Sequence, residues 1–457
     1  MGRSGEERRG DTGTRRRGEG GSMSEPKEKP GYIKGGWRAH YILFLLSLAY
    51  MMDYADRMVI GSLIPFIKRD WGLSDSQLGS FTSVIYLTIS VFVLPASVLI
   101  DRWSRRKMIS IMVGLWSLAT LACAYSRNFG QLLFTRALIG LGEAGYAPGG
   151  TAMIAAIYPK ESRARVMGIW NAAIPIGAAV GFLAGGIIGK HWGWQAAFGL
   201  VSIPGFVLAV LFWFIRDYQT VRLDDPQGMS QAALGGHRGF FQKALELFRI
   251  RSLWFTYLGF AMNTFITTAV MTWLPSYFHR YKGFPMDKAG AMTAVVALAV
   301  LVGAPLGGFL ADHWMKRRAN ARMTLSAITS VLSGVLLFLA FFLGQTSFFL
   351  PLLILFGVVA VGYVAPSAAV TQDVVHPGLR ALSYGLCVVL QHVLGGAWSP
   401  MIVGALSDSF GLAEAMRIIP VFALLAALFL WTGSRTYAAD AARAKQVELE
   451  AERDKNA

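Results

Sequence analysis

The chain contains 457 residues, of which 54% are hydrophobic and only 15% are charged, with a net charge of +16. A soluble globular protein carries roughly 25% charged residues, so the composition excludes a typical soluble domain and predicts an integral, multi-pass membrane protein. The cations lie in the N-terminal tail and between apolar segments. We therefore interpret the positive charge as orienting membrane helices, and we expect no nucleic-acid partner.

The two ends of the chain differ in composition from its apolar middle. Residues 1–38 are rich in Arg, Glu and Gly and have too few large apolar residues to fold, so we expect a disordered N-terminal tail. Residues 436–457 are rich in Ala, Glu, Lys and Arg and are expected to form a cytoplasmic tail, either as a solvated helix or without order.

Apolar stretches of membrane-spanning length recur along the chain, since a bilayer core needs about 20 apolar residues per helix. Helices are expected near residues 40–64, 76–100, 107–126, 130–157, 164–189 and 195–215, and again near 253–279, 288–312, 322–344, 348–373, 381–406 and 412–434. The sequence therefore predicts an all-α membrane protein with twelve transmembrane helices. They form an N-terminal six-helix bundle (39–216) and a C-terminal one (253–435), joined by a polar cytoplasmic linker (217–252).

The distribution of Lys and Arg between the loops predicts the orientation. If both termini are cytoplasmic, the cytoplasmic loops contain 18 of these cations and the opposite loops contain eight. Cytoplasmic loops carry the excess of such residues in membrane proteins. We therefore expect both termini in the cytoplasm, and in a bacterium the membrane would be the inner (plasma) membrane.

Two sequence signatures recur with nearly the same spacing. Residues 97–107 (SVLIDRWSRRK) are echoed by residues 308–318 (GFLADHWMKRR), 211 positions later, so that Asp101 matches Asp312. Arg163 in turn matches Arg380, 217 positions later. This repetition indicates a duplicated half, which is typical of secondary transporters.

The first and fourth predicted helices carry ionisable residues at membrane depth. Asp53 and Arg57 are four residues apart and can pair on one helix face, which leaves Asp56 without a partner on its own helix. In the fourth helix Arg136 and Glu143 are two turns apart and share a face. Ionisable residues at this depth usually face a water-filled cavity or a charged partner.

This polar cluster has two interpretations. It is either a satisfied network that joins the two helices or a proton-coupling site, because burial raises the pKa of a carboxyl group and a nearby cation lowers it. In the second interpretation Glu143 and Asp56 carry the proton, with Asp53 beside them. Arg57 then binds an anionic part of the substrate, and Arg136 is the next candidate for that role.

Polar residues of the seventh and eleventh helices are expected to complete a cavity at the membrane midplane. They are Asn263, Thr264, Thr267, Thr268, Gln391 and His392. For His392, a core histidine bonded to a neighbour is an equal interpretation.

Three glycines of the fifth helix, Gly177, Gly181 and Gly185, are spaced four apart and therefore lie on one face. Small residues at this spacing let two helix backbones approach closely. We interpret them as a packing surface and not as a binding site.

The six-plus-six arrangement, the basic central linker and the twice-used Asp-(Arg/His)-x-x-(Arg/Lys)-Arg loop resemble the major facilitator superfamily, over residues 40–435. One departure is Ser97, where the family usually has Gly. The resemblance implies alternating access and gives the loop the role of a cytoplasmic gate between the halves. The gate residues are then Asp101, Arg102, Arg105, Arg106, Asp312 and Arg317. The alternative, that these arginines only set the topology, stays open.

The Asp56-Arg57 pair and the sequence Gly142-Glu-Ala-Gly-Tyr146 resemble the spinster branch of this superfamily. That resemblance implies a lysophospholipid or sphingoid-type substrate and links Asp56, Arg57 and Glu143 to coupling and substrate binding. The anion:cation symporter branch, which moves sugar acids, also has Asp-Arg and Glu-Ala at these positions. A small organic or sugar acid is therefore the alternative substrate.

Two other functional classes have fewer features in the sequence. Metal-ligand spacing, a nucleophile–base signature and a nucleotide-binding loop are not found, so we expect no enzyme, no metal and no cofactor. A non-transporting membrane sensor is the alternative of another class, although neither tail is long enough for a soluble output domain. The sequence thus predicts a monomeric, proton-coupled secondary active transporter whose partners are its substrate, protons and the bilayer.

Overall fold

A computed structural model describes residues 36–158, 160–215, 247, 249–344, 346–375 and 379–456. These residues are mostly helical, and no strand occurs among them. The predicted N-terminal tail lies outside the described residues up to residue 35, and so does the predicted linker, apart from residues 247 and 249–252.

The helices of the first half cover the predicted ranges in order. They are α1 (Trp37–Trp71), α2 (Asp75–Arg102), α3 (Arg105–Ala124), α4 (Phe129–Glu143), α5 (Tyr146–Ile157), α6 (Lys160–Asn171) and α7 (Ala173–Phe214). The predicted helix 130–157 is divided into α4 and α5 at Ala144 and Gly145. Within α7, Gly193 has a φ of 85° and marks the turn between two of the predicted helices.

The helices of the second half show more interruptions than the sequence predicts. They are α10 (Arg251–Lys282), α11 (Met286–Met315), α12 (Ala321–Phe342), α13 (Phe349–Val359), α14 (Val364–Asp373), α15 (Arg380–Leu390), η2 (Gln391–Gly396), α16 (Ser399–Phe410), α17 (Leu412–Ile418) and α18 (Pro420–Asn456). The predicted helix 348–373 is divided into α13 and α14, and η2 is a π-helical turn inside the predicted helix 381–406. The predicted C-terminal tail continues α18 as a helix.

Eight helical segments among the described residues are long and apolar enough to cross a membrane. One of them, Arg165–Phe214, covers two predicted helices. α1 and α10 are less apolar because they carry the polar residues of the predicted site, and α4 and α5 are individually short. The protein is therefore an integral, multi-pass membrane protein, whereas the count of twelve crossings and the position of the termini remain predictions.

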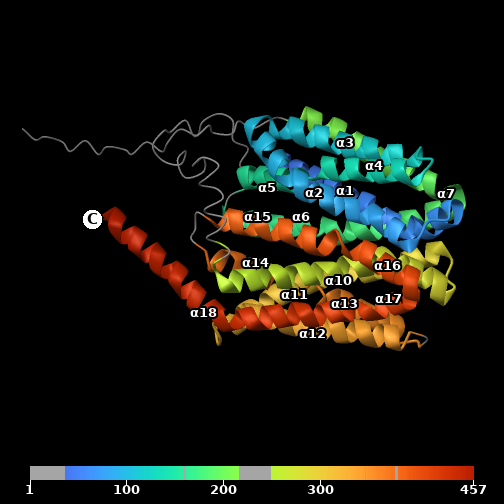
Figure 1. Cartoon of the computed structure of the whole chain (residues 1–457). Helices are drawn as coiled ribbons and strands as arrows, with labels where there is room; N and C mark the ends of the chain where they lie inside the picture. The colour runs from blue at the N-terminus through green and yellow to red at the C-terminus, as the bar shows by residue number, and fades with distance from the viewer. Residues whose placement is uncertain are drawn as a thin grey trace, which may run out of the picture. The chain divides into compact units, whose positions relative to one another are not determined.

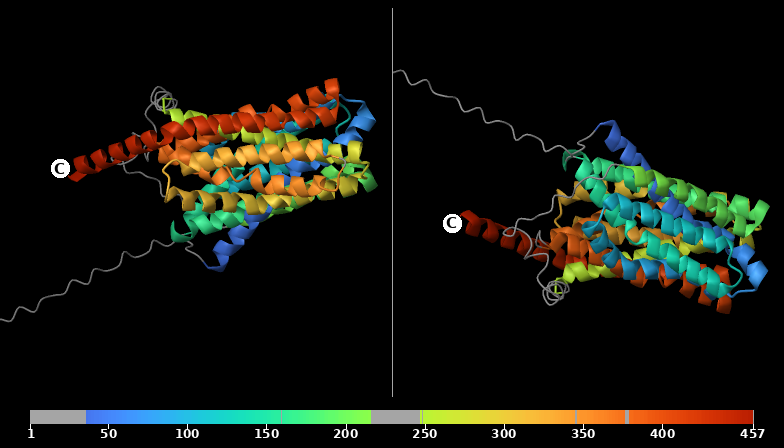
Figure 2. Two further views of the ribbon diagram at one scale, coloured as in Figure 1. Left: turned by 90° about the horizontal axis from the view of Figure 1, so that it is seen from below. Right: turned by 90° about the horizontal axis from the view of Figure 1, so that it is seen from above.

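Figures 1 and 2 show how the helices are arranged within the unit Ile33–Ala457. The blue-to-green helices α1–α7 lie together, and the yellow-to-red helices α10–α18 lie together (Figure 1). Seen from below, the yellow-to-red helices lie in front, and seen from above, the blue-to-green helices do (Figure 2). α2 packs against α16, and α7 packs against α11, so these four helices join the two halves.

The helix ends repeat between the halves. α1 is followed by Gly72, with a φ of 63°, and α10 is followed by Gly283, with a φ of 65°. Glycine adopts this left-handed conformation without the strain that a side chain would add. The two glycines are 211 positions apart, as are Asp101 and Asp312, and in each case the next helix begins three positions later. The same turn is used twice, which supports duplication.

α7 packs closely against α1 along the predicted stripe of small residues. A Cβ atom at Gly181 would lie 2.5 Å from the carbonyl oxygen of Ala55, and one at Gly185 would lie 2.7 Å from that of Val59. Gly177 meets the same helix one turn earlier. The spacing of four residues therefore correctly predicts a packing surface, and this surface fixes the helix that carries the ionisable residues.

We expect Gly181→Ala to destabilise the protein, because the added methyl group overlaps the Ala55 carbonyl oxygen and must push α1 and α7 apart. Overpacking of this kind costs about 1–3 kcal/mol and should lower the melting temperature of the purified protein in detergent. Gly168→Ala is the matched control, since a methyl group there meets open space. Equal melting temperatures for the two variants would contradict close packing of α1 on α7.

Candidate functional site

Arg57 of α1 lies at the centre of a buried group of charged side chains. Its Nε donates to Oε2 of Glu143 at 2.7 Å, and its Nη2 donates to both carboxylate oxygens of Asp53 at 3.1 Å. The side chains of Arg57, Asp53 and Glu143 are only 9%, 1% and 0% exposed. One guanidinium group thus bridges two turns of α1 and the end of α4.

The local structure explains why these three residues meet. Asp53 and Arg57 are one helical turn apart, which places their side chains on the same face. Glu143 is the last residue of α4, where the helix dipole disfavours a negative charge. The ion pair with Arg57 offsets this effect. Removing one partner of a buried ion pair costs about 3–5 kcal/mol, so the cluster strongly favours contact between α1 and α4.

Arg136 of α4 uses its guanidinium group differently. It is fully buried and donates to the main-chain carbonyl oxygens of Phe81 at 3.3 Å, Asp56 at 3.0 Å and Arg57 at 3.2 Å. These carbonyls belong to α1 and α2, so Arg136 joins three helices through their backbones. The contacts are those of a structural residue, and its part in substrate binding stays a prediction.

Two carboxylate oxygens of this group, Oδ1 of Asp56 and Oε1 of Glu143, are buried and have no hydrogen-bond partner among the described residues. The buried group contains three carboxyls (Asp53, Asp56 and Glu143) and two guanidiniums (Arg57 and Arg136). Fully ionised, it would therefore carry one excess negative charge. Because an uncompensated charge is costly away from water, the composition of the group favours one bound proton.

Two tyrosines of the first half and one histidine of the second half lie near Arg57. The ring centroid of Tyr54 lies 4.9 Å from Cζ of Arg57. Tyr86 of α2 packs edge-on against His392, with 5.3 Å between ring centroids, and both lie within electrostatic range of Arg57. Nδ1 of His392 is buried without a hydrogen-bond partner in the described part of the chain. Tyr54 and Tyr86 were not predicted as site residues, because aromatic residues are common in membrane helices.

Gln391 and His392 lie on the π-helical turn η2. Here the N–H of Ala397 donates to the carbonyl oxygen of His392 at 2.7 Å, five residues back. Such turns insert one extra residue into a helix and frequently occur at functional sites. Oε1 of Gln391 accepts from Oγ1 of Thr264 at 3.3 Å, so this turn links α10 to the His392 region.

Asn263 and Thr267 make their hydrogen bonds within the second half. Nδ2 of Asn263, which is 2% exposed, donates to the Gly259 carbonyl at 3.1 Å and to Ser330 of α12 at 2.9 Å. Thr267 donates to carbonyl oxygens one turn back in α10, at 3.2 Å. Neither residue is brought to Arg57 by these contacts, and their predicted substrate-binding roles stay predictions.

The first copy of the predicted cytoplasmic gate is described only in part. Asp101 and Arg102 end α2, and their side chains lie outside the described part of the structure. Arg105 is partly buried at the start of α3. Arg106 donates to the carbonyl oxygens of Trp213 at 3.0 Å and Ile215 at 2.6 Å, which joins α3 to the end of α7.

In the second copy, the acid pairs with a cation beyond the motif. Asp312 contacts Arg322 of α12 at 3.3 Å, whereas the predicted Arg317 is exposed. Arg322 also pairs with Asp373 at the end of α14, and the Tyr437 hydroxyl donates to Asp373 at 2.7 Å. Arg322, Asp373 and Tyr437 line a cavity of about 390 Å³. The available sequence signal was the position of Arg322 in the first turn of the helix after the motif.

A second charged network lies at the opposite end of the same helices, and the sequence analysis missed it. Asp75, the first residue of α2, accepts from Arg280 of α10 at 2.6 and 2.8 Å and from Lys68 of α1 at 2.6 Å. Ser407 of α16 donates to Asp75 at 2.5 Å. Asp408 accepts from the backbone N–H groups of Asp75 and Ser76, at 2.7 and 2.9 Å. The start of α2 is therefore bound by both halves.

The duplicated acid of the second half makes a similar contact. Asp287, in the first turn of α11, lies 212 positions after Asp75 and accepts from Lys190 of α7 at 2.7 Å. Asp75 is 3% exposed, whereas Asp287 is 32% exposed. The two halves also approach closely here, since a Cβ atom at Gly186 would lie 2.5 Å from the carbonyl oxygen of Met286.

Comparison with known proteins decides the family. Residues 46–400 match the Major Facilitator Superfamily. The chain belongs to this superfamily. Protein spinster of Drosophila melanogaster is 28% identical to this chain over 385 residues. The aligned residues cover 81% of this chain and 62% of the fly protein, so the chain spans less than two thirds of that relative's length. The hexuronate transporter of Bacillus subtilis is 27% identical over 283 residues, which cover 61% of the chain and 66% of that transporter.

The fold agrees with this assignment to the Major Facilitator Superfamily. A crystal structure of a bacterial homologue of the human lysosomal transporter spinster, in an inward-facing and unoccupied conformation, aligns with a TM-score of 0.77. The alignment covers 89% of this chain and 99% of that one, at 23% identity. The predicted resemblance to the spinster branch is confirmed. The Bacillus relative is named a transporter, and the bacterial structure is named a homologue of one.

The contacts of Arg136 predict a structural phenotype. We expect Arg136→Lys to lower the melting temperature, because a lysine ammonium cannot reproduce the fork of donors that reaches three carbonyls. Each lost hydrogen bond from the charged guanidinium group costs about 1.5–3 kcal/mol. Arg69→Lys is the control, since the Arg69 side chain is 74% exposed. A stable Arg136→Lys protein that has lost substrate binding would instead assign Arg136 to the binding site.

Proposed function

We propose that this protein is a proton-coupled secondary active transporter that works by alternating access. The observation that carries the proposal is the sharing of the buried Arg57 guanidinium between Asp53 and Glu143. The proposed topology has twelve crossings, bundles at 39–216 and 253–435, and both termini in the cytoplasm. Membership of the Major Facilitator Superfamily supports it.

Substrate and carboxylate compete for Arg57 in the proposed cycle. An anionic group that binds the guanidinium must replace at least one carboxylate now bound to it. The displaced carboxylate is then a buried charge without a cation, which is costly. Uptake of a proton removes that charge. Substrate and proton therefore bind together, and they leave together when the carboxylate regains Arg57.

Glu143 is the carboxylate that we assign to this exchange. It holds Arg57 through one hydrogen bond from another helix, which a side-chain movement can break, whereas Asp53 accepts two and is held four residues away on the same helix. Asp56 contributes a second position for the proton, because its Oδ1 lacks a hydrogen-bond partner among the described residues. Coupled acids of this kind titrate as a unit.

The opposite ends of the helices provide the two gates. The network around Asp75 holds α2 against α10 and α16 at the end that we assign to the non-cytoplasmic side. Opening that end requires these bonds to break, while the loop motif at Asp101 and Asp312 closes the cytoplasmic end. Fold similarity to a structure in an inward-facing conformation is compatible with this assignment.

We propose an amphipathic anion as the substrate, such as a lysophospholipid or a sphingoid-type lipid. The resemblance of Asp56-Arg57 and residues 142–146 to the spinster branch implies a lipid, and the rings of Tyr54 and Tyr86 offer apolar surface beside the charge of Arg57. The alternative is a small sugar acid, which the relation to a hexuronate transporter favours. Both substrates carry the anion that Arg57 binds.

We expect Glu143→Gln to uncouple transport while leaving the fold intact, because the amide keeps the shape but cannot carry the proton. In proteoliposomes with an imposed pH gradient, the variant should lose accumulation of substrate but keep exchange of labelled for unlabelled substrate. In weakly buffered detergent, binding to the wild-type protein should take up about one proton, and binding to the variant should take up fewer, because only Asp56 is left to accept it. Glu414→Gln, at a side chain that is 53% exposed, is the control.

Arg57→Gln in the same assays should abolish binding of either substrate class. Lysophosphatidylglycerol represents the lipid class and glucuronate the sugar-acid class. When both are offered in competition at stoichiometric concentrations, only the compound of the transported class should occupy the site. Gradient-driven accumulation by the Glu143→Gln protein would contradict its role in coupling. Substrate binding that is indifferent to Arg57 would move recognition to another residue.

The Asp75 network predicts a shift of conformation. We expect Asp75→Asn to populate a state open at this end, because the amide cannot form the ion pairs with Arg280 and Lys68. Spin labels on Trp192→Cys and Phe410→Cys, both 67% exposed and on opposite halves, should report a longer distance. Asp287→Asn, which breaks one more exposed ion pair, should have a smaller effect. The reverse order would contradict the proposed gate.

A further inference from the structure

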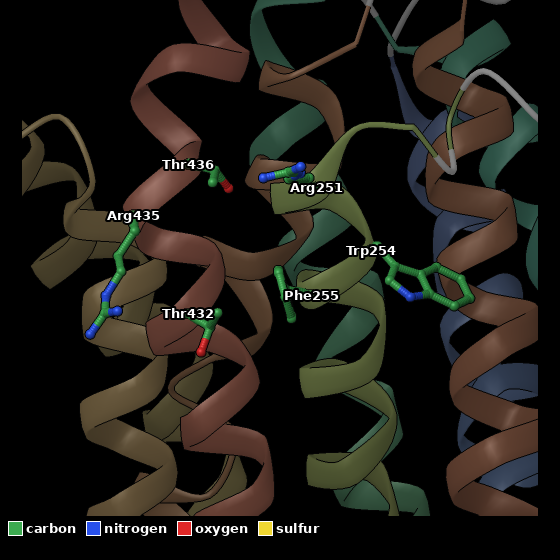
Figure 3. Close-up of a pocket in the computed structure, with 6 residues that line it drawn as sticks. All are labelled: Arg251, Trp254, Phe255, Thr432, Arg435 and Thr436. Atoms are coloured by element: carbon green, nitrogen blue, oxygen red, sulfur yellow. The ribbon is translucent and has the colours of Figure 1, made fainter.

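A groove between α10 and α18 has no part in the proposed transport cycle. Its volume is about 430 Å³, and Arg57 is not among its lining residues, which are Arg251, Trp254, Phe255, Thr432, Arg435 and Thr436 (Figure 3). It involves the first turns of α10 and the middle of α18, at the end of these helices that the loop charges assign to the cytoplasmic side.

The side chains around the groove place cations on both helices. In Figure 3, Arg251 extends from the start of α10 toward Thr436 of α18. Phe255 and Thr432 lie below them in this view, and Arg435 extends from the other side of α18, away from Arg251. The groove therefore combines an apolar ring, two hydroxyl groups and two guanidinium groups from separate helices.

The outer face of α18 shows where the groove lies relative to the membrane. Val421, Leu424, Leu428 and Trp431 follow one another at helical spacing and are 51%, 56%, 58% and 49% exposed. An exposed apolar stripe of this length on a membrane helix faces lipid. Arg435 is the next residue on this face, and a cation at the end of such a stripe marks the level of the lipid head groups.

Neither Arg251 nor Arg435 forms an ion pair with an acidic residue in the described part of the chain. The acid on the following turn of α18, Asp440, accepts instead from the backbone N–H and the hydroxyl group of Ser252, at 3.0 and 2.7 Å. Trp254, 37% exposed on α10, adds an aromatic residue of the kind enriched at membrane interfaces.

We propose that this groove binds the head group of an anionic phospholipid of the surrounding membrane. The phosphate lies against the guanidinium group of Arg251, since guanidinium groups suit phosphate oxygens. Arg435 adds a second positive charge at the head-group level of α18, and the acyl chains follow the apolar stripe of that helix. Basic pockets between membrane helices on the cytoplasmic side bind such head groups. The bound lipid is a resident ligand that ties the first helix of the second half to the last one.

The test uses the purified full-length protein in nanodiscs or detergent. Phosphatidylglycerol, titrated into protein in a neutral detergent, should raise the melting temperature and remain bound in native mass spectrometry, whereas phosphatidylcholine should do neither. The double variant Arg251→Gln/Arg435→Gln should weaken the apparent affinity for phosphatidylglycerol about thirtyfold. The double variant Arg251→Lys/Arg435→Lys, which keeps both charges, should retain most of the affinity.

Arg318→Gln/Arg443→Gln is the control, because it removes the same charge from exposed positions outside the groove. An equal loss of affinity in this control would show a general charge effect and overturn the site. Inorganic phosphate that stabilises the protein as well as phosphatidylglycerol would overturn the lipid as its occupant. An unchanged affinity of the Arg251→Gln/Arg435→Gln protein for phosphatidylglycerol would also refute the proposal. Transport by that variant tests the proposed function and not the lipid site.

Discussion

The buried guanidinium of Arg57, shared between Asp53 and Glu143, is the interaction on which the first half of the molecule depends. A charge placed this deep must have a partner, so the cluster dictates which helices stay together. Other residues of the first half hold the helices that carry Asp53, Arg57 and Glu143 in place, and they do not take part in the proposed proton exchange. Arg136 fixes the backbones of α1, α2 and α4, and the glycine stripe of α7 fixes α1 from the other side. The scaffold and the titratable site are thus separate sets of residues.

The duplication explains why acids occur at both ends of α2 and α11. Asp75 and Asp101 lie near the two ends of α2, and Asp287 and Asp312 occupy matching places in α11. At one end Asp75 and Asp287 each contact the opposite half, from which the proposed cycle must release them. The copies have nonetheless diverged, because Asp75 is nearly buried under several donors, whereas Asp287 has one partly exposed partner. The proposed gate is therefore asymmetric, although the two acids occupy matching places in a repeat.

Hydrophobic length and residue spacing predicted the helices, the glycine stripe and the Asp53–Arg57 pair, because these are properties of one segment. The breaks at Gly145 and at η2 were not predictable, because the apolar pattern continues across them. The position of such a break depends on contacts with neighbouring helices. Contacts across the fold were equally hidden. Arg280 was visible as a loop cation, but its partner lies 205 residues away. Arg136 was visible as a buried charge, yet its acceptors are main-chain carbonyls, which leave no trace in a sequence.

The charge count of the cluster also bears on which substrates the proposed cycle can carry. In the proposed cycle a singly charged anion at Arg57 replaces one carboxylate, and the proton on that carboxylate keeps the total charge of the buried group constant. Nothing in this exchange depends on the remainder of the substrate. Selectivity then lies with the groups around Arg57, namely Tyr54, Tyr86 and the η2 turn with His392. In the proposed cycle the same coupling site can therefore accept either a lipid anion or a sugar acid, and the residues around Arg57 decide between them.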